Sequence, residues 1–378
     1  MKKNLPLSYI EISKKNLINN VRQFRSLVKK GTNISVAIKG NAYGHGQNDV
    51  ARILEPFVDY FQVNSVEELE LLREISSKET LLLGYIEGAD LLKAIKLGVI
   101  ISIFSIEELI KVNGIGEKLN LRQEIHIPVD AHLGREGFLL TELTELFREI
   151  KKSKYIKVSG IYAHFANIED TSNFSHAQKQ IREYEKALDL ARSFGFKNFE
   201  THISATSGVL VYEKDTGAYS LVRLGLGAYG MWPSEHIKFL FENKITLMPV
   251  LSWKTKIAQV KVLPKGHSIG YGLSYITRRK TKIAVIPQGY ADGLPRALSN
   301  KGEVLIGGTR CKILGRISMN MFVADVSHLS RAEAEDEVVI IGKQSREQIT
   351  VEEIAKRLDT INYEITTRIS PLLPRVVV

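Results

Sequence analysis

The feature that most constrains the fold is a regular alternation of short apolar runs with amphipathic stretches. Eight runs, apolar or rich in β-branched residues and typical of buried strands, end near Ile38, Asn64, Tyr85, Phe104, Val129, Ala163, Ile203 and Leu224. Helix-like stretches lie between or before them: Lys14–Lys30, Gln47–Pro56, Ser65–Ser76, Ala89–Lys96, Ser105–Asn113, Thr141–Lys152 and Phe174–Ser193. Ser65 and Ser105 each begin a Ser-x-x-Glu sequence, the form of a capped helix start. Strands that alternate with helices pair in parallel, so residues 8–234 are predicted to form a (β/α)8 barrel.

The pattern changes after about Ser234, beyond the short breaker Trp232-Pro233-Ser234. Strand-like runs then follow one another: Val250–Val262, Lys282–Ile286, Val304–Ile306, Arg310–Leu314, Met321–Val326 and Glu337–Gly342. Only one clear helix, Val351–Leu358, interrupts them. Residues 235–378 are therefore predicted to form a second, mostly antiparallel β domain, against which residues 1–7 could pack.

The composition is that of an ordinary globular enzyme, with 44% hydrophobic and 25% charged residues. Lys2 and Lys3 are not followed by the apolar segment of a signal peptide, and the longest apolar stretch, near Leu97–Phe104, is too short to span a bilayer. We therefore expect a cytoplasmic protein without a membrane partner.

Charge and cysteine content exclude further classes of protein. The net charge of +10 comes from scattered clusters that are not interleaved with aromatic residues, so we expect no nucleic-acid partner. The single cysteine, Cys311, argues against an internal disulfide and against a thiolate metal site, and no metal is expected.

Lys39 stands where the first predicted strand becomes a loop, in the run Val36-Ala37-Ile38-Lys39-Gly40-Asn41-Ala42-Tyr43. Apolar surroundings lower the pKa of an ammonium and favour the free amine. A free amine can form a Schiff base with a carbonyl compound. The alternative is a solvent-facing lysine before a glycine-rich turn, and the other strand ends help to decide between the two.

In a (β/α)8 barrel, chemistry gathers at the C-terminal ends of the strands. The unusual polar residues of this chain follow the predicted strands: Lys39, Arg135, His164, His202, Ser204, Thr206 and Arg223. Gly225 and Gly227, after the eighth strand, would let backbone N–H groups approach a phosphate, although they could simply form a tight turn. The sequence thus predicts an active site on this face of the barrel.

Two tyrosines of the second domain stand between glycines, Tyr271 in Gly270-Tyr271-Gly272 and Tyr290 in Gly289-Tyr290-Ala291-Asp292-Gly293. An accessible phenol of this kind can act as an acid or a base when its pKa is tuned. A surface tyrosine in a turn is the alternative.

Together these motifs resemble the alanine racemase family along nearly the whole chain. The strings that carry the resemblance occur in family order: the lysine motif, Arg135, Ala163-His164-Phe165, Val222-Arg223-Leu224-Gly225, Tyr271, Gly289–Gly293, Gly315-Arg316-Ile317-Ser318-Met319 and Ile361-Asn362-Tyr363-Glu364. The resemblance implies a barrel that binds pyridoxal 5′-phosphate (PLP), a C-terminal β domain and a head-to-tail homodimer with shared active sites. The implied activity is the interconversion of L- and D-alanine, which supplies D-alanine for the cell wall.

The resemblance also implies roles for individual residues. Lys39 would carry PLP and act as one base, and Tyr271 of the partner subunit would be the second, because racemisation removes a proton from one face of Cα and returns it to the other. Arg223 would face the pyridine nitrogen. The other implied cofactor and substrate residues are His164 against the ring, His202 behind Arg223, Tyr43, Thr206, Gly225, Leu226 and Tyr363 at the phosphate, and Arg135, Met319 and Tyr290 near the substrate.

Two positions depart from the family pattern. Pro128 stands where the family often has a lysine that can be carbamylated, and Asn320 stands where an aspartate is usual. Two anions expected near Arg135 are therefore missing. A bound anion such as chloride, a carboxylate such as Asp130 or Glu136, or solvent could replace them, and the bound anion is the interpretation we favour from sequence.

Other functions remain open at this level. A racemase for serine or larger amino acids is the nearest alternative, and a decarboxylase of the same barrel class is another. The non-enzyme alternative is a PLP-binding homeostasis protein. Such proteins resemble the barrel alone, so the β domain with Tyr271 argues against it.

Overall fold

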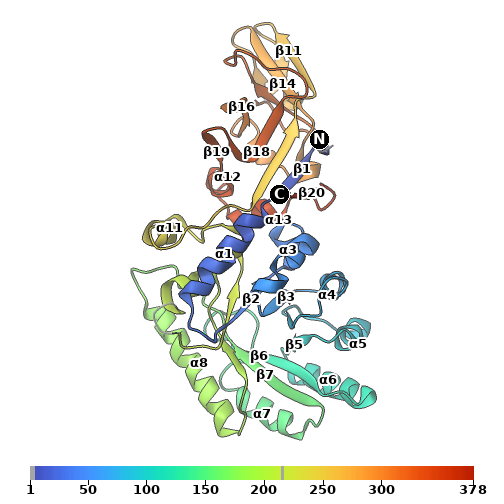
Figure 1. The fold of residues 1–378 in the computed structure, drawn as a ribbon, viewed down its shortest axis with the longest axis vertical. Helices are drawn as coiled ribbons and strands as arrows, with labels where there is room; N and C mark the ends of the chain where they lie inside the picture. Colours follow the sequence, from blue (N-terminus) through green and yellow to red (C-terminus); the bar gives the residue numbers. More distant parts are fainter. Residues whose placement is uncertain (1–4, 214–216) are drawn as a thin grey trace.

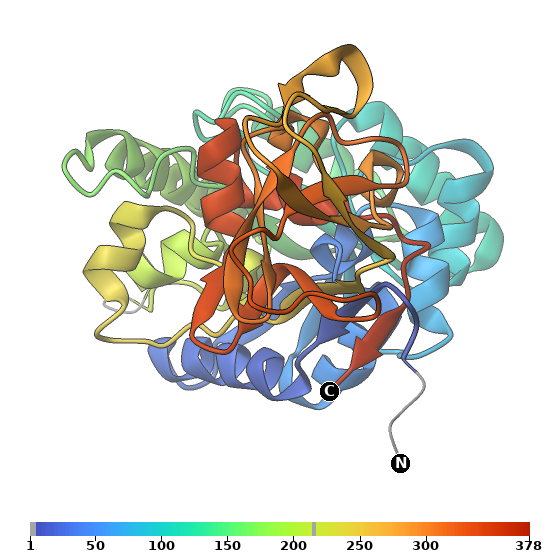
Figure 2. The ribbon, with the colours of Figure 1, turned by 90° about the horizontal axis from the view of Figure 1, so that it is seen from above.

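The computed structural model describes residues 5–213 and 217–378. Two parts are stacked along the long axis of the molecule, with the barrel below and a β-rich part, orange and red, above (Figure 1). The C-terminal end of the chain lies near the level where the two parts meet. Seen from above, the β-rich part covers the barrel (Figure 2).

The barrel is an eight-stranded parallel sheet whose order is β9-β2-β3-β4-β5-β6-β7-β8. Its strands are β2 (Asn33–Ala37), β3 (Tyr60–Val63), β4 (Thr80–Leu82), β5 (Ile100–Ser102), β6 (Gln123–Pro128), β7 (Ile156–Tyr162), β8 (Glu200–His202) and β9 (Leu221–Leu224). Backbone hydrogen bonds from Ser220 N–H to the Thr201 carbonyl (3.1 Å) and from Arg223 N–H to the Ser204 carbonyl (3.0 Å) link the last two strands and nearly close the sheet. The predicted barrel is confirmed.

Helices surround this sheet. They are α1 (Lys14–Leu27), α3 (Gln47–Leu54), α4 (Val66–Arg73), α5 (Gly88–Lys96), α6 (Ile106–Leu119), α7 (Leu143–Lys152) and α8 (Ser175–Ser193), with short turns α2 (Lys39–Tyr43), η1 (Glu55–Phe57), α9 (Thr206–Gly208), η2 (Val209–Glu213) and η3 (Leu226–Tyr229). Ser65 and Ser105 cap α4 and α6 as predicted, because their hydroxyls accept the N–H groups of Glu68 and Glu108. None of the helices in the described ranges is long and apolar enough to cross a membrane.

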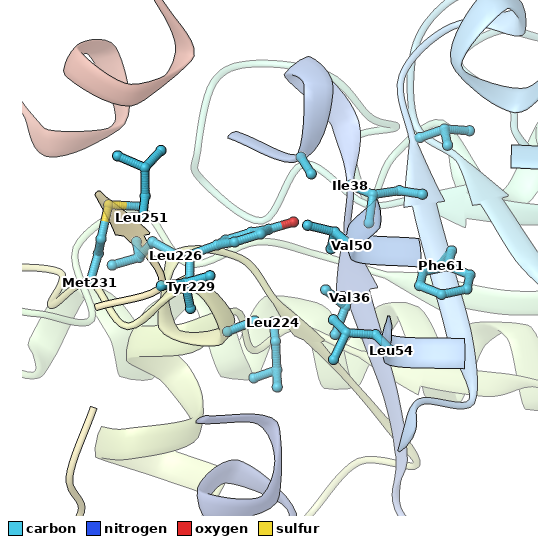
Figure 3. Close-up of a cluster of buried hydrophobic side chains, with 14 of the residues drawn as sticks. Val36, Ile38, Val50, Leu54, Phe61, Leu224, Leu226, Tyr229, Met231 and Leu251 are labelled. Carbon is cyan, nitrogen blue, oxygen red and sulfur yellow. The ribbon is translucent and has the colours of Figure 1, made fainter. Parts of the chain in front are cut away.

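The barrel core fixes the strand that carries Lys39. Val36 and Ile38 of this segment are fully buried, and Val50 of α3 packs near them (Figure 3). Tyr229 reaches towards β2 from the β9 side, and its hydroxyl donates a hydrogen bond of 2.6 Å to the Ala37 carbonyl. Large apolar side chains such as these each contribute about 1.5–3 kcal/mol on burial, so the end of β2 is held rigidly.

The second sheet has the order β11-β14-β17-β16-β15-β18-β10-β1-β20, and β19 pairs with β18. Its strands are β1 (Tyr9–Ile12), β10 (Leu251–Lys256), β11 (Gln259–Leu263), β14 (Thr281–Ile286), β15 (Glu303–Ile306), β16 (Thr309–Leu314), β17 (Phe322–Asp325), β18 (Glu337–Gln344), β19 (Glu347–Ile349) and β20 (Arg375–Val377). Every pair in it is antiparallel except β1 with β20. The predicted antiparallel domain is confirmed.

Smaller elements complete this part. They are the hairpin of β12 (Ser268–Ile269) and β13 (Tyr275–Ile276), the helices α11 (Glu235–Phe241), α12 (Val351–Leu358) and α13 (Asn362–Thr367), and the turns η4 (Tyr271–Leu273), η5 (Tyr290–Asp292) and η6 (Arg296–Leu298). We expected only one helix after residue 234, and that was wrong, because α11 and α13 are too short to show a clear helical period in sequence.

Strand β1 lies inside the range predicted for the barrel, residues 8–234, yet it pairs with β10 and β20 of the second sheet. Four residues cannot reveal their pairing partners in sequence. The boundary at residues 234 and 235 stays a prediction, and residues 1–4 of the segment predicted to pack on the second domain lie outside the described residues.

Candidate active site

A cavity of about 930 Å³ opens at the C-terminal ends of the barrel strands. The second part of the chain contributes to its wall through Tyr363 and Thr367 of α13. Nine of the predicted site residues line it: Lys39, Tyr43, Arg135, His164, Thr206, Arg223, Gly225, Leu226 and Tyr363. Most of these residues follow barrel strands, so strand ends that are far apart in sequence meet in one cavity.

Lys39 follows β2 and projects into this cavity. Burial lowers the pKa of its ammonium, and the nearby Arg135 guanidinium lowers it further. Within residues 5–213 and 217–378, no group accepts a hydrogen bond from Lys39 Nζ or forms an ion pair with it. A partly buried amine without a partner is suited to covalent chemistry with a carbonyl compound.

The four residues after Lys39 form a left-handed turn. The φ angles are +61° at Gly40, +52° at Asn41, +53° at Ala42 and +54° at Tyr43. Only glycine adopts this conformation without steric cost. The turn is nevertheless well connected, because Gly40 N–H donates to Glu68 Oε1 (2.7 Å) and the carbonyls of Ala42 and Tyr43 each lie 3.0 Å from His45 Nδ1.

One end of the cavity gathers hydroxyl groups. The rings of Tyr43 and Tyr363 lie 5.9 Å apart, and a Cβ on Gly225 would come within 3.1 Å of Tyr43 Oη. Thr206 Oγ1 accepts the N–H groups of Gly225 (3.3 Å) and Gly227 (3.2 Å). The two glycine amides expected to be free are thus already bonded, and it is the hydroxyl hydrogen of Thr206 that remains to be donated.

Arg223 lies across the floor of the cavity and is 6% exposed. Its Nη2 donates to the Ala163 carbonyl (2.7 Å) and to His164 Nδ1 (3.1 Å), and its Nη1 donates to His202 Nδ1. No carboxylate forms an ion pair with it among the described residues. Burial lowers its pKa to about 10, so the guanidinium remains charged near neutral pH. Its Nε–H has no hydrogen-bond partner in the described part of the chain and is left for a ligand.

His164 and His202 differ in position. His164 lines the cavity, and burial together with the Arg223 charge lowers its pKa to about 3. His202 is fully buried behind Arg223, as predicted for a supporting residue, and its ring stacks on Tyr162 at a centroid distance of 5.0 Å. Both imidazoles are therefore neutral near pH 7.

Arg135 forms an ion pair with its neighbour Glu136, whose Oε1 lies 2.7 Å from Arg135 Nη2. This hydrogen bond raises the pKa of Arg135. Asp130 is occupied elsewhere, because its carboxylate accepts the N–H groups of Leu133 and Gly134. Of the alternatives left open for Arg135, the structure shows pairing with a protein carboxylate, Glu136, and the bound anion that we favoured stays a prediction.

Three predicted residues lie outside the cavity, on an exposed face of the second part. The exposed fractions are 72% for Tyr271, 54% for Met319 and 43% for Tyr290. Tyr290 N–H donates to the Ser318 carbonyl (3.1 Å), so the Tyr290 and Met319 turns are adjacent. Leu273, Ile276 and Met321 are also exposed, at 66%, 53% and 50%. Apolar exposure on this scale is typical of a surface that another protein covers.

Several residues of the site were missed in sequence. Tyr162, Phe165 and Glu169 line the cavity, and Ser207 donates to Glu169 Oε1 (2.7 Å). His126 contacts His202 beneath the cavity. A histidine inside the otherwise apolar Ile125–Val129 was the available signal for His126. Phe165 stood in the Ala163-His164-Phe165 string without a role of its own, and nothing in the local sequence singles out the others.

Comparison with known proteins places this chain in a family. The profile of the alanine racemase N-terminal domain matches residues 12–233, and that of the C-terminal domain matches residues 250–377. Alanine racemase from Leptospira interrogans is 36% identical over 378 residues, covering 98% of this chain and 96% of that protein. The relative from Symbiobacterium thermophilum is 34% identical, covering 94% and 93%.

Solved structures agree with these matches. The alanine racemase of Streptomyces lavendulae superposes with a TM-score of 0.92 at 30% identity, covering 100% of this chain and 98% of that one. The structure from Bartonella henselae, described with covalently bound pyridoxal phosphate, has a TM-score of 0.87 at 26% identity, covering 99% and 100%.

Proposed function

The chain belongs to the alanine racemase family of isomerases, and on this premise we propose that it interconverts L- and D-alanine by proton transfer at Cα, with PLP bound at Lys39. The observation that carries the proposal is the convergence, in one cavity, of three groups that have no partner within the described ranges of the chain. These are the Lys39 amine, the Nε–H of Arg223 and the hydroxyl hydrogen of Thr206.

The residues present fit PLP. When bound, PLP supplies the electron sink that makes the proton on substrate Cα acidic. Lys39 would hold it covalently, and the hydroxyls of Tyr43, Thr206 and Tyr363 would donate to its phosphate. Glycine at position 225 supports this fit, since a side chain there would crowd Tyr43 Oη.

Arg223 would donate its Nε–H to the pyridine nitrogen. A guanidinium with a pKa of about 10 keeps its proton near pH 7, so it binds the nitrogen without protonating the ring. A ring that stays unprotonated is a weaker electron sink. This favours simple return of the proton to Cα over side reactions.

Two bases are needed on opposite faces of Cα. Lys39 serves one face, and its lowered pKa makes the free amine accessible. Tyr271 of the partner subunit serves the other face in a homodimer, which the exposed position of Tyr271 beside Leu273 and Ile276 supports. Arg135 would bind the substrate carboxylate together with the backbone at Met319 of the partner subunit, and Tyr290 of the partner subunit would line the entrance.

The test is chiral analysis of the purified protein with added PLP. L-alanine, D-alanine and L-serine are offered separately, and borohydride reduction followed by peptide mapping locates the cofactor. We expect both alanine enantiomers to give the racemate and the label to fall on the peptide that contains Lys39. Faster racemisation of serine would assign the broader racemase. Release of CO₂, or retention of a single enantiomer, would contradict the proposal.

A further inference from the structure

Two buried histidines extend from Arg223 into the barrel interior. His126 on β6 and His202 on β8 are each 0% exposed. His202 Nδ1 accepts from Arg223 Nη1, and His202 Nε2 lies 3.0 Å from His126 Nδ1. The guanidinium is thus the first member of a chain of three side chains.

Arg223 determines which ring nitrogens of His202 and His126 carry a proton. Arginine has only N–H donors, so His202 Nδ1 must be the bare, accepting nitrogen. A neutral imidazole then carries its proton on Nε2 and donates it to His126 Nδ1. His126 in turn carries its proton on Nε2, and this nitrogen is buried without a partner among the described residues.

Both rings are neutral, because burial lowers the pKa of His126 to about 3 and that of His202 well below its usual value. The rings are also held in place. Tyr162 stacks on His202 at an interplanar angle of 9°, and a Cβ on Gly160 would lie 2.4 Å from His126 Nε2. Only glycine at position 160 leaves room for the His126 ring.

We propose that His126 is a positioning residue for Arg223: by accepting the Nε2–H of His202 it selects the tautomer whose bare Nδ1 receives the guanidinium. Without this acceptor, the Nε2–H of His202 would be buried without a partner, and this would destabilise the tautomer that Arg223 needs. The other tautomer would turn an N–H towards an N–H of Arg223 and displace it. The inference deepens the proposed function, since Arg223 is there the group that meets the cofactor nitrogen.

Two variants of His126 distinguish a side chain that accepts a hydrogen bond from one that only fills space. His126→Leu removes the acceptor, whereas His126→Gln keeps a carbonyl that can accept. Gln123→Leu is the matched control, because Gln123 is a buried polar residue of the same strand and donates to the Val99 carbonyl (2.6 Å) instead of to the histidine chain.

The first measurement is made on the apoprotein. Nitrogen NMR of ¹⁵N-histidine-labelled protein should show a protonated Nε2 and a bare Nδ1 for His202. In His126→Leu, His202 should no longer occupy this one tautomer. A protonated Nδ1 in the unaltered protein would overturn the inference, even if His126→Leu failed to fold. This result does not depend on PLP binding, so it separates the inference from the proposed function.

The second measurement is the PLP dissociation constant from absorbance titration. We expect His126→Leu to raise it about tenfold, the effect of one misdirected hydrogen bond to a charged group, while His126→Gln changes it by less than about threefold. Gln123→Leu should lower the midpoint of thermal unfolding without changing PLP affinity. Equal losses of affinity in all three variants would mean that His126 only fills space, and this would overturn the inference.

Discussion

Replacing Arg375 should weaken PLP binding, because this residue clamps the left-handed turn after Lys39 from the far end of the chain. Arg375 begins β20, and its Nη2 and Nε donate to the Gly44 carbonyl at 2.7 and 3.3 Å. Its Nη1 donates to the carbonyls of Ser370 (2.7 Å) and Leu373 (2.6 Å), which fix the guanidinium in the tail. The clamp therefore joins the cofactor turn to the second sheet.

The expected rise in the PLP dissociation constant is estimated from the cost of the left-handed backbone and from the strength of the Arg375 hydrogen bond. Each of the non-glycine residues Asn41, Ala42 and Tyr43 costs about 1–2 kcal/mol in the left-handed region, or about 3–6 kcal/mol in total. A hydrogen bond from a charged donor stabilises by about 1.5–3 kcal/mol. Arg375→Met would remove one such clamp while His45 and Glu68 keep theirs, so the dissociation constant of PLP should rise by about 10- to 150-fold.

The assay is equilibrium titration of apoprotein with PLP, followed by absorbance. Arg368→Met is the matched control, because Arg368 pairs with Glu364 on the neighbouring helix α13 and its side chain is 64% exposed. An exposed pair of this kind contributes about 1 kcal/mol or less, so affinity should change by about fivefold at most. Equal PLP affinity in Arg375→Met and Arg368→Met would refute the reasoning, as would a loss in Arg375→Met that is matched by global unfolding.

Three further predictions concern the bases, the Arg135 pair and the buried histidines. Tyr271→Phe should lower the rate of racemisation by at least about 10²-fold. Mixing the Tyr271→Phe and Lys39→Ala proteins should restore part of the activity through hybrid dimers. If activity does not return although subunits are shown to exchange, each active site lies within one chain. Glu136→Gln should raise the KM for alanine and make it depend on chloride at constant ionic strength, because Arg135 loses its carboxylate; a KM indifferent to chloride would contradict this role. Four histidines are neutral in the fold, and below about pH 6.5 the unfolded chain binds protons that the folded chain does not, so the free energy of unfolding of the apoprotein should fall by up to about 1.4 kcal/mol per pH unit for each as pH drops from about 6.5 towards 4. These residues are His45, His126, His164 and His202, whose pKa values are all lowered by burial. Urea unfolding at pH 7 and pH 5 measures the effect, and equal stability at the two values would contradict it.

The barrel was predictable because its signals are local. Alternation of strand-like and helix-like stretches, and caps such as Ser65 and Ser105, depend on residues a few positions apart. The strand-end rule then placed Lys39 and Arg223 in one cavity without knowledge of any contact. Strand β1 was not predicted for the opposite reason, because its pairing with β20 joins the two ends of the chain.

The rest of the site depends on contacts that sequence spacing does not encode. Arg375 and Gly44 are 331 positions apart, and His126 and His202 are 76 apart. The partner of Arg135 shows a different limit. Glu136 is its immediate neighbour, but only the direction of the two side chains shows that they pair, and a residue pattern does not specify direction.

The way Arg223 is buried links the electrostatics of the cavity to its chemistry. Burying a charge is costly, and an aspartate partner would have been one way to offset that cost. Arg223 instead meets carbonyls, two neutral imidazoles and the face of Tyr162, so its positive charge is stabilised without being cancelled. The uncancelled charge acts on the whole cavity: it adds to the effect of burial and of the Arg135 charge, which lower the pKa of Lys39 more strongly, and it attracts an anionic ligand. Neutral histidines around Arg223 therefore preserve its contribution to the lowered pKa of Lys39, which a carboxylate in their place would oppose.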